Sequence, residues 1–100
     1  MNEYQNNIRR FQKPALFETE VTHALLGIGS EAGEILDCIK KPWFSPRDDV
    51  PREVDHKHLE EEIGDLLFYV CWLAALFHID IDAAAATNIT KLERRYAEKK

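Results

Sequence analysis

Four carboxylates at a repeated spacing are the residues of this chain best suited to chemistry. Glu31 and Glu34 lie three apart in the run SEAGE, and Glu62 and Asp65 repeat that spacing in the run EEIGD. Each pair stands beside a glycine, inside a stretch that otherwise reads as an apolar helix. Because partial burial of several like charges is unfavourable, the pattern predicts that a cation is bound there.

The ligand chemistry indicates which cation this would be. On a helix with 100° between residues, Glu31 and Glu34 lie on one edge of an apolar stripe, and Glu62 and Asp65 lie on the matching edge of another. Antiparallel packing through these stripes would gather all four. Oxygen ligands without His or Cys at ligand spacing favour Mg²⁺, with Mn²⁺ as a substitute. The alternative is a set of surface carboxylates paired with lysines.

Two long amphipathic helices must position these side chains. Apolar residues recur at three- and four-residue intervals from about Phe17 to Ile39, and Pro42 is expected to end that helix. A second helix is expected from a cap at Asp55 to about His78. The predicted core stripes are Val21, Ala24, Leu25, Ile28, Ala32, Ile35, Leu36 and Ile39 in the first helix, and Leu59, Ile63, Leu66, Leu67, Val70, Leu73, Ala74 and Phe77 in the second.

The remaining segments are short. Residues 1–13 predict a short N-terminal helix, and residues 42–56, with three prolines, predict a loop. A third long helix is expected from a cap at Asp80 to about Arg95. The sequence shows no alternation typical of a strand. We therefore predict a single all-α domain over residues 1–100, a bundle of three main helices plus the short N-terminal one.

The second helix is apolar nearly all round after Asp65. Phe68, Tyr69, Trp72 and Leu76 lie off its predicted core stripe. A helix of this kind has to be buried on every side, which three helices of one chain can hardly achieve. We therefore expect a homo-oligomer, a dimer or a tetramer, in which neighbouring chains complete a four-helix core.

All four glycines lie inside the two long helices, at positions 27, 29, 33 and 64. Glycine in a helix interior costs about 1 kcal/mol relative to alanine, so each is expected to have a structural reason. We interpret them as contact faces where helices cross closely. The alternative is that Gly27 and Gly29 break the first helix.

Composition excludes several classes of protein. The formal net charge of −5 argues against a nucleic-acid binder, whose phosphate contacts need a basic surface. No run reaches the roughly 18–20 apolar residues of a membrane span, and the N-terminus carries no secretory signal pattern. Cys38 and Cys71 lack ligand spacing and are expected to be buried free thiols of a reducing compartment, which predicts a cytoplasmic protein.

The paired acidic motif carries a resemblance to a known family. Glu31-x-x-Glu34 followed by Glu62-x-x-Asp65, in the runs GSEAGEILDCIKK and LEEEIGDLLFYVCWLA, resembles the MazG-like all-α nucleotide pyrophosphohydrolases. The resemblance implies a helical bundle that dimerises or tetramerises and binds Mg²⁺ through these four residues. It also implies a reaction that splits a nucleoside triphosphate into the monophosphate and pyrophosphate.

The resemblance extends to Tyr4-Gln5 and to the third helix, where Asn88-x-x-Lys91 is followed by Arg95-Tyr96. Asn88, Lys91 and Arg95 share one helical face and are candidates to hold the phosphates from the side opposite the metal. The alternative is that these three residues only form a basic, solvated face of the helix.

The resemblance places Glu31 and Glu34 among the catalytic residues and gives the water-activating role to Glu31. The leading hypothesis is therefore a Mg²⁺-dependent nucleoside triphosphate pyrophosphohydrolase. One alternative is a pyrophosphohydrolase specialised for one biosynthetic or deoxy nucleotide. Another is a non-catalytic helical oligomer that binds a partner protein.

Overall fold

The computed structural model describes residues 1–44 and 52–98, and all of their regular structure is helical. A short helix α1 (Glu3–Ile8) runs into a 3₁₀ turn, η1 (Arg9–Phe11). Three longer helices follow: α2 (Phe17–Trp43), α3 (His56–Leu76) and α4 (Ile81–Glu98). The prediction of an all-α fold with a short N-terminal helix is confirmed. The expected loop over residues 42–56 lies partly outside the described residues.

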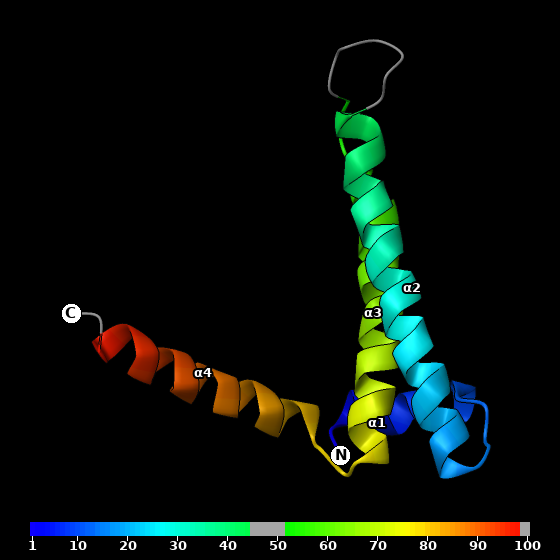
Figure 1. Ribbon diagram of the computed structural model, residues 1–100, viewed down its shortest axis with the longest axis vertical. Helices are drawn as coiled ribbons and strands as arrows, with labels where there is room; N and C mark the ends of the chain where they lie inside the picture. The colour runs from blue at the N-terminus through cyan, green and yellow to red at the C-terminus, as the bar shows by residue number, and fades with distance from the viewer. Residues whose placement is uncertain (45–51, 99–100) are drawn as a thin grey trace.

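Helices α2 and α3 pack side by side as an antiparallel hairpin, and α1 lies across one end of it (Figure 1). We call that end the base, where α2 begins and α3 ends, and the opposite end the tip. The predicted caps are confirmed. An Asp55 carboxylate oxygen accepts from the backbone N–H of His58 at 3.1 Å, and one of Asp80 accepts from that of Ala83 at 3.0 Å.

The chain turns sharply between α3 and α4. His78 adopts a left-handed conformation with φ of 58°, and the backbone N–H of Ile79 bonds back to the carbonyl of Ala74 at 2.8 Å. This bonding pattern is a common helix end, because it satisfies carbonyls that the helix leaves free. The axes of α3 and α4 are consequently bent by 96°.

Helix α2 runs one residue past Pro42, which we expected to end it. A proline near a helix end removes only one N–H from the ladder, and the next turn still closes. The backbone N–H of Phe44 donates to the carbonyl of Lys40 at 2.8 Å. The two lysines of the last turn also suit the negative end of the helix dipole.

The face of α3 that packs on α2 differs from the predicted one. Cys71 and Trp72 are fully buried, whereas Ile63 and Phe77 of the predicted stripe are about half exposed. Within the single chain the predicted core stripe of α3 is confirmed only in part, because Leu59, Leu66, Leu73 and Ala74 are half-buried and its other members are exposed. A helix that is apolar nearly all round gives no periodicity to choose a face, and close packing on α2 makes the choice instead.

The close packing depends on one glycine. A Cβ atom at Gly27 would collide with the ring of Tyr69, whereas one at Gly29, Gly33 or Gly64 would meet nothing. The interpretation of the glycines as crossing points is confirmed for Gly27 only. Within the chain it is wrong for the other three, and α2 runs unbroken through Gly27 and Gly29.

A buried polar cluster ties the N-terminal segment to the base. Glu20 accepts from the guanidinium of Arg9 at 2.9 Å and from the indole N–H of Trp72 at 3.1 Å. The hydrogen bond from Arg9 holds the pKa of Glu20 below its ordinary value. Gln5 donates to the carbonyl of Ile79 and accepts from the N–H of Ile81, both at 2.9 Å. These bonds fix where α3 ends and α4 begins.

Helix α4 leaves the base and packs along neither α2 nor α3 (Figure 1). Nearly all of its described side chains are exposed. None of the described helices is by itself long and apolar enough to cross a membrane. The bent pair of α3 and α4, taken together, is long and apolar enough to cross one. Helices from the core of a soluble protein can meet the same criterion of length and composition.

Candidate functional site

The structure brings three of the four predicted carboxylates together. One carboxylate oxygen each of Glu31, Glu62 and Asp65 lies within 4.8 Å of the other two. Glu31 comes from α2 and the other two come from successive turns of α3, so the group exists only because the hairpin places its helices in this register. Glu31 and Glu62 are half-buried, and Asp65 is exposed. We call these three residues the acidic cluster.

Glu34 lies outside this three-residue group. It sits one helical turn from Glu31 toward the tip, is exposed, and lines a pocket there. Its negative charge still acts on Glu31, since it contributes to the raised pKa of that carboxyl. The hairpin therefore gathers three carboxylates tightly and holds the fourth at the edge of the same site.

The electrostatics of Glu31 distinguish the cluster from an ordinary surface ion pair. Burial raises the pKa of Glu31 above its ordinary value, and so do a hydrogen bond with Glu62 and the charges of Asp65, Glu62 and Glu34. Pairing with a lysine would lower that pKa. Such a pair does occur one turn past Glu34, where the Lys41 ammonium lies 3.9 Å from a carboxylate oxygen of Asp37. The alternative, a surface carboxylate paired with a lysine, therefore describes Asp37 and not Glu31.

The donor set suits a hard divalent cation. Glu31, Glu62 and Asp65 offer only oxygen ligands, which are the ligands that Mg²⁺ and Mn²⁺ prefer. Glu34 lies one helical turn from Glu31, outside this donor set. A cation held there would relieve the repulsion that raises the pKa of Glu31.

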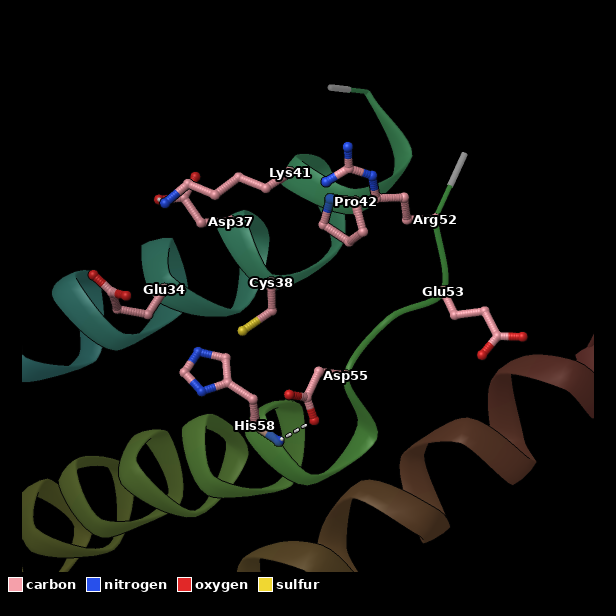
Figure 2. Close-up of a pocket in the computed structure, with 9 residues that line it drawn as sticks. All are labelled: Glu34, Asp37, Cys38, Lys41, Pro42, Arg52, Glu53, Asp55 and His58. Atoms are coloured by element: carbon pink, nitrogen blue, oxygen red, sulfur yellow. Dashed lines mark hydrogen bonds and ion pairs between the residues drawn. The ribbon is translucent and has the colours of Figure 1, made fainter. Parts of the chain in front are cut away.

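A pocket of about 460 Å³ lies on the side of the cluster that faces the tip, and Figure 2 draws the residues that line it. The imidazole Nε2 of His58 lies 3.7 Å from a carboxylate oxygen of Glu62, so His58 borders both the cluster and the pocket. The thiol of Cys38 and the ring of His58 point toward each other in Figure 2. The lining residues are Glu34, Asp37, Cys38, Lys41, Pro42, Arg52, Glu53, Asp55 and His58.

The sequence reasoning did not assign a functional role to Asp37, Cys38 or His58. His58 lies in the first turn of α3. Its spacing of four residues before Glu62 was the available signal, since side chains at that spacing share a helix face. Both cysteines are free as expected, but only Cys71 is buried and Cys38 is half-buried.

The predicted phosphate-binding residues lie on another part of the molecule. Asn88, Lys91 and Arg95 are exposed on α4, which runs away from the hairpin (Figure 1). Lys91 lines a shallow pocket with its neighbours on that helix alone. The single chain does not bring these three side chains to the acidic cluster.

Comparison with known proteins agrees with this geometry. Residues 19–98 match the model of the MazG nucleotide pyrophosphohydrolase domain, which covers α2, α3 and α4. The chain belongs to the MazG family. The match includes every carboxylate of the acidic cluster and the three α4 residues. It leaves α1 and η1 outside, so the segment that seals the base is not part of the matched MazG domain.

One curated relative is the "Gene 37 protein" of Mycobacterium phage L5. It is 29% identical to the chain over 75 residues, which is 75% of this chain and 65% of the phage protein. The chain thus spans less than two thirds of that relative's length. No solved structure matches the chain.

Proposed function

We propose that the protein is a Mg²⁺-dependent pyrophosphohydrolase that converts a nucleoside triphosphate to the monophosphate and pyrophosphate. Membership of the MazG family supports the reaction class. The observation that carries the metal dependence is the acidic cluster, in which three carboxylates converge within 4.8 Å. Three carboxylates held this close repel one another, and a divalent cation bound between them would relieve that repulsion.

The residues of the cluster divide the chemistry between them. Glu31, Glu62 and Asp65, with Glu34 at the edge, would hold Mg²⁺, which when bound neutralises charge that develops on the phosphate oxygens. We assign the role of proton acceptor to Glu31, which lies on α2 opposite the two carboxylates of α3. It would take a proton from a water that attacks the α-phosphorus as the bond to the pyrophosphate oxygen breaks. The products are the monophosphate and pyrophosphate.

We infer that the working form is a homo-oligomer. A groove of about 560 Å³ runs between α2, α3 and the start of α4, and its lining is wholly apolar. Leu25 and Phe77 both line this groove and are each 52% exposed, so the groove presents large apolar side chains to solvent. A second copy would cover this face and build the four-helix core.

The same second copy would complete the site. Helix α4 carries Lys91 and Arg95 away from its own acidic cluster, so these cations can reach phosphates only at another chain's cluster. Asn88, Lys91 and Arg95 of one subunit would then bind the phosphates held by the other subunit's carboxylates. Positive charge opposite a metal-phosphate group stabilises the leaving pyrophosphate.

The test is pyrophosphate release from a panel of canonical and modified nucleoside triphosphates, with Mg²⁺ and with EDTA. We expect turnover only with the metal, and a fall of about 100-fold or more in Glu34→Gln and Asp65→Asn. Glu60→Gln, an exposed glutamate on α3, is the matched control and should keep the wild-type rate. A wild type inert across the whole panel would favour a non-catalytic oligomer. Turnover confined to one nucleotide would favour the specialised enzyme.

A further inference from the structure

Along the hairpin, the acidic cluster is flanked by packed aromatic rings toward the base and by a pocket toward the tip. Toward the base, the ring of Tyr69 occupies the space beside Gly27, one turn from Glu31. Trp72 continues this packing, fully buried, with its ring stacked on that of Tyr69. The rings of Tyr69 and Trp72 therefore fill the space between α2 and α3 beside Gly27.

Toward the tip, the pocket of about 460 Å³ begins where the cluster ends. Glu34 and His58 line it, and His58 reaches Glu62 of the cluster at 3.7 Å. The volume falls within the roughly 300–1,000 Å³ typical of small-molecule sites. A substrate whose reacting phosphate lies at the cluster can therefore extend into this pocket.

The charges of the pocket select which end of the substrate enters. Four carboxylates line it (Glu34, Asp37, Glu53 and Asp55) against two permanent cations, Lys41 and Arg52. Lys41 is moreover paired with Asp37 at 3.9 Å. Such a lining repels a phosphate chain and accepts hydrogen bonds from neutral groups that carry N–H or O–H donors.

We propose that this pocket is the nucleoside subsite and takes the sugar and base of the nucleotide. The inference rests on the proposed function and deepens it, since it assigns opposite directions to the two ends of the substrate. The α-phosphate lies at the acidic cluster. The nucleoside extends toward the tip of the hairpin, and the pyrophosphate leaves away from it, on the side open to the basic face of a second subunit.

Cys38 makes this arrangement directly testable, because it lines the pocket while the other cysteine, Cys71, is fully buried. The wild-type protein is treated with N-ethylmaleimide in the presence of Mg²⁺, and modification of Cys38 is followed by mass spectrometry. We expect the ribo- and deoxynucleoside monophosphate of the turned-over nucleotide to slow the modification at least about fivefold at saturation. Pyrophosphate, which carries no nucleoside, should change it less than about twofold.

Two variants test the same subsite by inhibition kinetics. Cys38→Leu adds bulk inside the pocket and is expected to weaken inhibition by the nucleoside monophosphate about tenfold, with inhibition by pyrophosphate within about twofold of wild type. Lys41→Ala should weaken monophosphate inhibition in the same sense. Lys40→Ala is the matched control, since Lys40 is the adjacent lysine and lies on a different pocket.

The outcomes separate the two proposals. Turnover with no protection of Cys38 by any monophosphate, or equal effects of Cys38→Leu on both products, would overturn the nucleoside subsite and leave the proposed function standing. Absence of turnover together with absence of protection would overturn both. Protection by pyrophosphate alone would place the phosphate chain in the pocket and reverse the assigned direction.

Discussion

Two glutamates on the same helix show how local surroundings decide what a carboxylate does. Glu20 is buried, yet Arg9 and Trp72 satisfy it, and the pKa of its carboxyl is lowered. Glu31 is half-buried among other carboxylates, and the pKa of its carboxyl is raised. The charge of Glu20 is balanced within the protein, whereas Glu31 is the carboxylate for which we propose a bound cation.

This contrast gives a pH dependence for the metal-free protein. Since the folded state raises the pKa of Glu31 above its ordinary value of 4.5, stability contributed by the protonated form is lost as pH rises from that value through the raised one. In EDTA at pH 7.5, Glu31→Gln is therefore expected to have a higher free energy of unfolding than wild type. Urea unfolding measures this, and the gap should close near pH 4.

The control for that prediction is Glu20→Gln, for which we expect the free energy of unfolding to change in the opposite direction. The lowered pKa of Glu20 stabilises the fold above pH 4.5, and this stabilisation is lost as pH falls through the lowered value. Glu20→Gln should be less stable than wild type by about 2 kcal/mol at pH 7.5, because charge-assisted hydrogen bonds are weakened. A Glu31→Gln protein that is likewise destabilised in EDTA would contradict the assignment of Glu31 to an unpaired site.

At the scale of elements, the hairpin register depends on the contact between Gly27 of α2 and Tyr69 of α3. The ring of Tyr69 stands where a Cβ atom of residue 27 would lie. This contact is one turn from Glu31 on α2 and one turn from Asp65 on α3. The glycine therefore sets the distance between the helices at the point where their carboxylates converge.

Gly27→Ala is expected to destabilise the protein by about 1–3 kcal/mol, since the added methyl forces Tyr69 or the helices apart. Thermal unfolding without metal measures this loss, and weaker Mg²⁺ binding should accompany it. Gly64→Ala is the matched control, because its Cβ would meet nothing and alanine favours a helix by about 1 kcal/mol. Equal effects of the two substitutions would show that close packing at residue 27 does not set the register.

For the whole molecule, the decisive feature is that α4 does not fold back on the hairpin (Figure 1). An exposed apolar groove and an isolated helix that carries Lys91 and Arg95 are the two observations behind the proposed second chain. The assembly and the reaction are then linked, because the carboxylates and the cations of one site would come from different subunits.

Complementation between inactive variants tests this link. Asp65→Asn and the double variant Lys91→Ala with Arg95→Ala should each be inactive alone. The two variants are mixed in equal amounts, unfolded and refolded together, so that half of the dimers formed at random contain one chain of each variant. Each mixed dimer has one intact site of two, so the sample is expected to recover about a quarter of wild-type activity. Light scattering on the same samples should show no stable monomer. Absence of recovery in confirmed mixed oligomers would place each site within one chain.

The sequence by itself determined the local features of this protein. Periodicity located the long helices, side-chain caps at Asp55 and Asp80 located two helix starts, and the i, i+3 spacing put Glu62 and Asp65 on one edge of α3. Each of these depends on neighbours within one or two helical turns, which the order of residues specifies directly.

Only the tertiary structure decided which face of α3 is buried, which glycine matters and where α4 goes. The apolar residues around α3 are too similar for periodicity to rank its faces, so the fit of Tyr69 and Trp72 against α2 made the choice. The 96° bend before α4 depends on a backbone turn at His78 and on two hydrogen bonds of Gln5, a residue far away in the sequence, which donates to the carbonyl of Ile79 and accepts from the N–H of Ile81. Contacts of that range are set by packing, so spacing along the chain could propose the acidic residues but could not show that Glu34 stands apart from the other three.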